Sequence, residues 1–310
     1  MQYMDFGQGV SASRIVLGTD SLGGLSLVNK RSNLKLLDKA FDCGINTFET
    51  ARMYRSEPLL GQWVSSRRRR SKIFLVTKGG FPSQPTTENI LRDCHSSLRA
   101  LRSEYVDSYL LHYDCESADI QDMLHTLDGL RAQGKVLSFG LSNFTLRRVQ
   151  QAHEYCCLNG VIPARFVSAH YGLMAWNTPY WKNAQTLVGP ENRIARAWYE
   201  SRGYSIFAYS PLGRGYFKFK AETGHRVTPD DSAANEERYH RACELACVKN
   251  VSPAQIALAY LLCQSSNVLA VIGCRTVEHL HADAAASGIA LSGSECSWLA
   301  MDSEPALSKR

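Results

Sequence analysis

Short apolar runs alternate with amphipathic segments along almost the whole chain of 310 residues. Continuous apolar stretches, such as the one at residues 73–76, predict strands that are buried on both faces, as in a parallel sheet. We expect eight such strands, at residues 14–17, 45–48, 72–77, 106–111, 137–141, 166–170, 205–209 and 268–272.

The segments between these strands carry apolar residues at helical spacing. Leu34, Leu37 and Phe41, for example, share one face of a predicted helix. Residue types that commonly begin or end helices flank these segments. Those that we expect to do so are Gly44, Thr87, Gly134, Gly160, Gly203, Ser252 and Pro253.

Eight strands that are each followed by helical sequence predict an α/β fold, a (β/α)₈ TIM barrel, in a single domain that spans residues 1–310. An open doubly wound sheet is the alternative, but no predicted strand-turn-helix carries G-x-G-x-x-G. We expect residues 1–12 to form a short hairpin at the bottom of the barrel. The long connections at 171–192 and 211–236 should extend over its C-terminal face.

The formal net charge of +6 is mild, and Lys and Arg are scattered apart from the run Arg67-Arg68-Arg69-Arg70. We interpret that run as a solvated turn and expect no binding of nucleic acid. The ten cysteines form no C-x-x-C pair and no zinc-site spacing. We therefore expect no metal site and a reducing, cytoplasmic location. No apolar run reaches membrane-spanning length, and the N-terminus has no signal-peptide pattern.

Four chemically distinct side chains lie at or just beyond consecutive strand ends: Glu49, Tyr54, Lys78 and His112. In a parallel barrel these ends meet at one face, so the four side chains should share a pocket. Such a set can deliver a proton to a carbonyl oxygen while a hydride reaches the carbonyl carbon. Taken singly, each residue is more often structural, and only their joint placement favours catalysis.

The order of several motifs resembles that of the aldo-keto reductase family. The matching segments are ETARMY (49–54), TK (77–78), the His at 112, GKVLSFGLSNF (134–144), AYSPLGRG (208–215), SPAQIAL (252–258) and IGCRT (272–276). The resemblance implies that Tyr54 is the general acid, Lys78 its activator, Glu49 the partner of Lys78, and His112 the group that orients the carbonyl. The family usually has Asp where this chain has Glu49.

The resemblance also implies a nicotinamide cofactor, NADPH by preference with NADH as the alternative. We expect Arg275 to open a helix near the last strand, and an arginine at a helix N-terminus suits a phosphate group. The residues implied in cofactor binding are Gly18, Thr19, Ser142, Asn143, Ser168, Tyr209, Ser210, Leu212, Gly213, Arg214, Gly273, Arg275, His279 and Asp283. Ser168 stands where the family often has Gln.

The implied activity is the reduction of an aldehyde or ketone, with a sugar or another polyhydroxy carbonyl among the candidates. Tyr113, Trp176, Tyr180 and Trp181 are candidate substrate contacts. The last three could instead anchor a long loop. The alternative function is a non-catalytic or weakly active regulatory protein of the same fold that binds a nucleotide, as potassium-channel β subunits do. We expect a small-molecule substrate and no membrane partner. The sequence is compatible with a monomer and leaves the oligomeric state open.

Overall fold

Eight parallel strands form a closed barrel in the computed structural model, which describes residues 1–23, 29–217, 220 and 230–302. The barrel order is β10-β3-β4-β5-β6-β7-β8-β9. The strands are β3 (Ile15–Gly18), β4 (Thr47–Glu49), β5 (Phe74–Gly79), β6 (Val106–Leu111), β7 (Val136–Ser142), β8 (Phe166–His170), β9 (Ser205–Tyr209) and β10 (Val268–Ile272).

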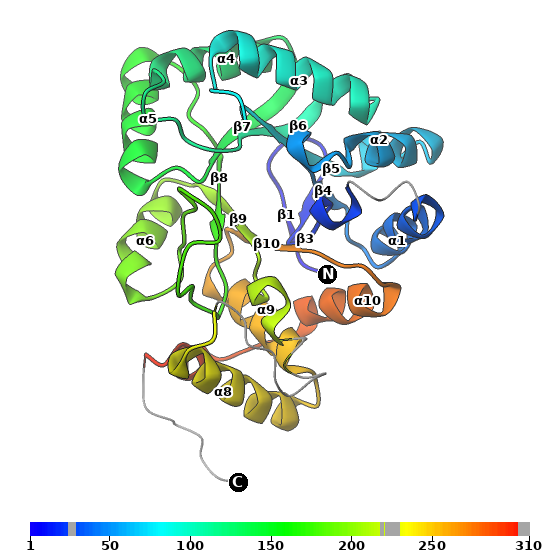
Figure 1. Ribbon diagram of the computed structural model, residues 1–310, viewed down its shortest axis with the longest axis vertical. Helices are drawn as coiled ribbons and strands as arrows, with labels where there is room; N and C mark the ends of the chain where they lie inside the picture. Colours follow the sequence, from blue (N-terminus) through cyan, green and yellow to red (C-terminus); the bar gives the residue numbers. More distant parts are fainter. Residues whose placement is uncertain (24–28, 218–219, 221–229, 303–310) are drawn as a thin grey trace.

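Helices surround this barrel on the outside (Figure 1). They are α1 (Lys30–Asp42), α2 (Glu57–Ser66), α3 (Thr87–Leu101), α4 (Ile120–Ala132), α5 (Leu146–Asn159), α6 (Arg193–Ser201), α8 (Ala233–Lys249), α9 (Pro253–Gln264), α10 (Val277–Ala285) and α11 (Gly293–Ala300). Short 3₁₀ turns are η1 (Asp20–Leu22), η3 (Arg52–Tyr54), η4 (Arg70–Lys72), η5 (Pro190–Asn192), η6 (Gly213–Gly215) and η7 (Ala286–Gly288). The predicted TIM barrel is thus confirmed.

Four strands have the bounds that the sequence predicts, namely β6, β8, β9 and β10. The other four differ by one or two residues at one or both ends. β5 continues through Lys78 to Gly79, because Lys78 pairs with Leu110 and Gly79 with Leu111 of β6. Tertiary pairing, rather than the end of the apolar run, therefore decides where β5 ends.

The predicted N-terminal hairpin is present as β1 (Tyr3–Met4) paired antiparallel with β2 (Ala12–Ser13). Phe6, at its tip, is buried inside the barrel and packs on Phe74 and Phe166, with ring centroids 5.3 and 4.9 Å away. Since strands β5 and β8 begin at those two rings, the hairpin closes the N-terminal end of the barrel.

The residues that begin and end the helices are those that the sequence predicts, with one exception. Gly44, Gly134, Gly160 and Gly203 all have positive φ at helix C-termini, a conformation that glycine adopts without steric cost. Ser252 forms a capping box with Gln255, and Pro253 is the first helical residue. The prediction of Thr87 as an N-cap is wrong: the side chain of Thr86 accepts the hydrogen bond from Asn89 N, and Thr87 lies inside the helix.

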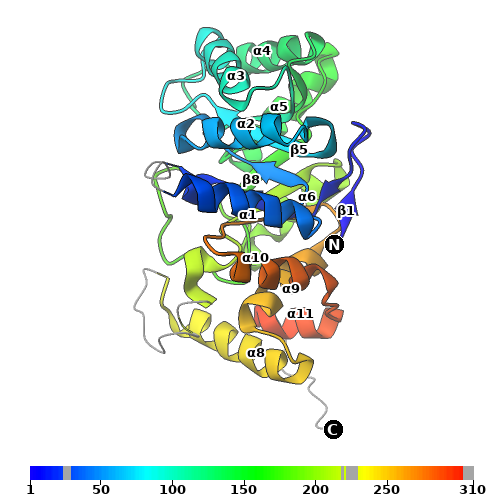
Figure 2. The ribbon, with the colours of Figure 1, turned by 90° about the vertical axis from the view of Figure 1, so that its right-hand side faces the viewer.

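A second apolar cluster lies outside the barrel, where α8 and α11 pack on α9. Figure 2 shows these three helices together at the end of the molecule where the chain finishes. In the described part of the chain, no single helix is long and apolar enough to cross a membrane. The pair α8 and α9 passes that test jointly but is bent by 97°, and most of α9 is buried in the protein.

Candidate active site

The centre of the site is a contact between a lysine and a tyrosine from neighbouring strands. Nζ of Lys78, in β5, donates a hydrogen bond of 3.1 Å to the phenolic oxygen of Tyr54, which lies in the turn after β4. The same ammonium nitrogen is 3.3 Å from the backbone oxygen of Thr50 and forms an ion pair with Glu49. Both charged side chains are almost completely buried, at 3% and 5% exposure.

Glu49 reaches Lys78 although its side chain is one methylene longer than the aspartate expected at this place. The space for it lies over Gly18, at the end of the neighbouring strand β3. A Cβ atom at Gly18 would stand 3.4 Å from Oε2 of Glu49 and 2.9 Å from Cγ1 of Val271. A side chain at Gly18 would thus clash with Val271, whereas its contact with the carboxylate of Glu49 would be an ordinary one.

Burial controls the proton affinities of the central pair. Burial lowers the pKa of Lys78 to about 7, while the charge of Asp20 acts in the opposite direction. Burial also raises the pKa of Tyr54, with further contributions from Asp20 and from the tyrosines 113 and 209. Tyr54 thus keeps its proton at neutral pH, and the ammonium of Lys78 is the nearby charge that favours its release.

His112 follows β6 and presents its ring edge-on to Tyr54, with ring centroids 5.5 Å apart. Burial, and then the charge of Lys78, lowers the pKa of His112 well below its ordinary value. The imidazole is therefore neutral at physiological pH. A neutral ring can donate one hydrogen bond to a carbonyl oxygen, but it is a poor source of a full proton.

The position of Tyr54 depends on two residues that the sequence did not single out. Gly23, after η1, lies so close to Tyr54 that a Cβ there would overlap the tyrosine's carbonyl oxygen. The hydroxyl of Ser56 is buried between the hydroxyls of Thr19 and Thr50, at 2.9 and 3.0 Å. These contacts fix both ends of the turn that carries the phenol.

Asn143 connects the catalytic side of the site to the predicted nicotinamide platform. Its side-chain nitrogen donates to the backbone oxygen of His112 (3.2 Å), and its side-chain oxygen accepts from the hydroxyl of Tyr209 (2.7 Å). Ser142 and Ser168 are buried neighbours on β7 and β8. Tyr209 ends β9, so the amide of Asn143, the hydroxyls of Ser142 and Ser168 and the ring of Tyr209 come from three adjacent strands.

The other residues predicted to bind the cofactor lie at or after the ends of β3, β9 and β10. In sequence order they are Gly18, Thr19, Ser210, Leu212, Gly213, Arg214, Gly273, Arg275, His279 and Asp283. The expectation that Arg275 opens a helix is wrong by two residues. Thr276 is the N-cap and α10 starts at Val277, so exposed Arg275 stands just before the helix N-terminus. Asp283 is buried and accepts a 3.1 Å hydrogen bond from the thiol of Cys274.

Three aromatic side chains extend from the catalytic residues across the barrel mouth. Tyr113 stacks on His112 at 5.0 Å and packs on Phe81 at 4.6 Å. Trp181 lies 6.4 Å from Tyr113 and 5.5 Å from Tyr209. Phe81, Tyr113 and Trp181 therefore form an aromatic wall between His112 and Tyr209, and the sequence did not single out Phe81.

Trp176 and Tyr180 have different surroundings. Trp176 stacks on the buried ring of His170, with centroids 4.3 Å apart, and Tyr180 packs on both. Nδ1 of His170 pairs with the hydroxyl of Thr186 at 3.0 Å. These contacts anchor the long loop after β8, as the alternative interpretation of these aromatics expects. Their role in substrate binding stays a prediction.

Comparison with known proteins decides the family. A sequence model described as "Aldo/keto reductase family" matches residues 14–300. The chain belongs to this family.

Among curated aldo-keto reductase relatives, norsolorinic acid reductase of Emericella nidulans is 30% identical, over 93% of this chain and 77% of its own length. The aryl-alcohol dehydrogenase [NADP(+)] of Phanerodontia chrysosporium is 26% identical, over 94% and 83%. A solved thermostable aldo-keto reductase in complex with the inhibitor epalrestat superposes with a TM-score of 0.78 at 25% identity, covering 97% of this chain and 99% of that one. An aldo/keto reductase of Klebsiella pneumoniae with NADPH, at 24% identity and a TM-score of 0.77, shares the fold over 100% and 97% of the two chains.

Proposed function

We propose that this aldo-keto reductase uses NADPH to reduce an aromatic aldehyde or ketone to the alcohol. The observation that carries the proposal is the hydrogen bond from Nζ of Lys78 to the phenol of Tyr54, beside neutral His112. A phenol held between an ammonium and an imidazole can donate its proton to an atom that lies next to both rings. That arrangement suits a carbonyl oxygen that gains negative charge during reduction.

NADPH, when bound, supplies the hydride. In this chain, Tyr209 offers an aromatic face for the nicotinamide ring, and Ser142, Asn143 and Ser168 offer polar atoms for its carboxamide. Asn143 at present shares its side-chain oxygen with Tyr209, so a carboxamide would take over part of that hydrogen bonding.

The phosphate-bearing end of the cofactor fits the ends of β9 and β10. Arg214 and Arg275 are exposed, and no ion pair of either appears among the described residues. Arg275 precedes the N-terminus of α10, where backbone N–H groups attract anions. Exposed Arg275 just before this helix N-terminus, with Arg214 after β9, favours the phosphorylated cofactor, NADPH, over NADH.

The aromatic wall favours a flat, aromatic substrate. Phe81, Tyr113 and Trp181 present ring faces and edges next to His112, and such faces pack well on another ring. The names of two relatives point in the same direction, because one is an aryl-alcohol dehydrogenase and the other a norsolorinic acid reductase. A sugar substrate is less well supported, because two of the three aromatics that suggested it, Trp176 and Tyr180, pack on His170.

The proposal is tested by measuring NADPH oxidation by the purified protein with either para-nitrobenzaldehyde or glucose as the substrate. We expect NADPH oxidation with the aromatic aldehyde at a much higher kcat/KM than with the sugar. A preference for glucose would contradict the substrate class. Tight NADPH binding with no turnover of any carbonyl would instead favour the regulatory alternative. The cytoplasmic location stays a prediction that fractionation of the source cells would test.

A further inference from the structure

Two arginines on adjacent helices adopt a backbone conformation that disfavours any residue with a Cβ atom. Arg68, just beyond the end of α2, has φ 50°, and Arg102, the C-cap of α3, has φ 52°. Glycine is the commonest residue at such left-handed helix ends because other residues are strained there. When a chain has arginine rather than glycine in such a strained conformation, the arginine side chain is a candidate for a function.

The two arginines lie on the same edge of the barrel. Arg70, two residues after Arg68, donates a 2.9 Å hydrogen bond from Nε to the hydroxyl of Ser103, the residue after Arg102. Both turns precede strands, β5 and β6, at their N-terminal ends. This edge is therefore opposite the face that carries Tyr54 and Lys78, and an occupant here would leave the active site open.

Part of the arginine run has a structural role, and part does not. Arg67 and Arg69 pair with Asp38, at 3.0 and 3.8 Å, and Arg70 pairs with Asp107 at 2.7 Å. Arg68 is exposed, and the described residues include no ion-pair partner for it. Within the run, Arg68 is thus the residue whose charge is available to another molecule.

The neighbouring surface adds further unpaired cations. An open groove of about 540 Å³ next to Arg102 is lined by His95, Leu98, Arg99, Arg102, Ser103, Glu104 and Lys135. Arg99, Arg102 and Lys135 make no ion pair with any described residue, and Glu104 is the single carboxylate of the lining. We call Arg68, Arg99, Arg102 and Lys135 the basic edge.

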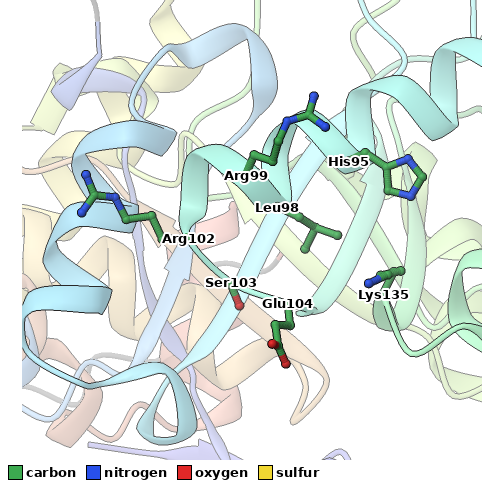
Figure 3. A pocket seen from close by; sticks show the side chains of 7 residues that line it. All are labelled: His95, Leu98, Arg99, Arg102, Ser103, Glu104 and Lys135. Atoms are coloured by element: carbon green, nitrogen blue, oxygen red, sulfur yellow. The ribbon is translucent and has the colours of Figure 1, made fainter.

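The cations of the basic edge are spread along the surface. Figure 3 shows Arg102 pointing away from His95 and Lys135, with Arg99 pointing to a third side. A single small anion could not contact them together, whereas an extended chain with several negative charges could.

We propose that the basic edge is a docking surface for an acidic peptide segment of a partner protein. Charge complementarity supports this occupant. A membrane is disfavoured because residues 54–157, all described, expose no large apolar side chain that could enter a bilayer. A nucleic acid is disfavoured because the ring of Tyr105, the tyrosine next to Glu104, is covered by the guanidinium of Arg70 at 3.8 Å and is not free to stack on bases.

Fluorescence anisotropy with a labelled oligoglutamate peptide at low salt tests the proposal on the full chain. The double variant Arg68→Gly with Arg102→Gly should bind the peptide about five- to tenfold more weakly than the wild type. Its melting temperature should rise by about 1–3 °C, since glycine relieves the left-handed strain. Glu104→Gln should bind the peptide more tightly. NADPH turnover should not change in either variant.

Arg202→Gly is the matched control, because Arg202 is an exposed C-cap arginine of α6 with an ordinary φ of −100°. It should leave peptide affinity unchanged and lower the melting temperature. The proposal is overturned if the wild type does not bind the peptide, or if the double variant binds it as well as the wild type. It is also overturned if the double variant melts at a lower temperature, or if single-stranded RNA or phosphatidylserine vesicles bind the edge more tightly than the peptide.

Discussion

Nζ of Lys78 lies 3.1 Å from the phenolic oxygen of Tyr54, and burial shifts the pKa values of the two groups in opposite directions. Burial favours the neutral form of each group, so it lowers the pKa of the lysine and raises that of the tyrosine. Most of the predictions below concern this pair or what positions it.

The rate of reduction should fall on the alkaline side of neutrality. Burial lowers the pKa of Lys78 below that of a free lysine, so the ammonium becomes an amine at a lower pH, and only the ammonium assists proton release from Tyr54. We expect kcat/KM to be constant below the pKa of Lys78 and to fall about tenfold per pH unit above it. His112 should add no acidic limb, because its pKa is already well below the ordinary value. A rate that stays constant far into the alkaline range would contradict this prediction.

The charge of the residue at position 49 should determine the pH at which kcat/KM begins to fall on the alkaline side. Glu49→Gln keeps a hydrogen-bond acceptor but removes the negative charge that favours the ammonium of Lys78, so the limb should shift to lower pH. Glu49→Asp keeps the charge and should retain the wild-type rate and limb. If the aspartate variant loses activity as severely as the glutamine variant, the length of Glu49 matters more than its charge.

A single methyl group at Gly23 should slow catalysis although Gly23 itself takes no part in the reaction. The Cβ of alanine would overlap the carbonyl oxygen of Tyr54 and push the phenol away from Lys78. We expect Gly23→Ala to lower kcat by at least about tenfold, with little change in the dissociation constant for NADPH. Gly129→Ala is the control, since nothing lies within 4 Å of a Cβ there, and an unchanged kcat in Gly23→Ala would refute the positioning role.

Arg275 should discriminate between the two nicotinamide cofactors. If its guanidinium binds the additional phosphate of NADPH, then Arg275→Ala should weaken NADPH binding by about 10- to 100-fold. NADH binding should change much less, because NADH lacks that group. Titration of cofactor fluorescence measures both affinities, and equal losses for the two cofactors would exclude a contact with the additional phosphate.

The sequence predicted the barrel and the four central residues because both follow local patterns. Short apolar runs with polar ends marked β6, β8, β9 and β10 to the residue. The family motifs then placed Tyr54 and Lys78 at neighbouring strand ends, where the structure brings them into contact.

Contacts between distant loops could not be predicted in this way. Gly23 lies in a loop without periodicity, and its effect on Tyr54 depends on how two separate strand ends approach each other. Phe81 follows the turn at Gly80 and contacts Tyr113 only after β5 and β6 have paired. The three aromatics of the β8 loop look equivalent in sequence, and only the fold separates Trp181 from the two that pack on His170.

The most direct test of the proposed chemistry is the rate of NADPH oxidation by Tyr54→Phe with para-nitrobenzaldehyde. Phenylalanine keeps the ring that packs on His112 but removes the hydroxyl that accepts the hydrogen bond of Lys78. Tyr105→Phe, which removes a phenol at the opposite end of the barrel beside Arg70, is the control and should stay active. We expect Tyr54→Phe to lose about 10²- to 10⁴-fold in kcat while it still binds NADPH. A Tyr54→Phe enzyme with wild-type kcat would contradict the role of Tyr54 as the proton donor.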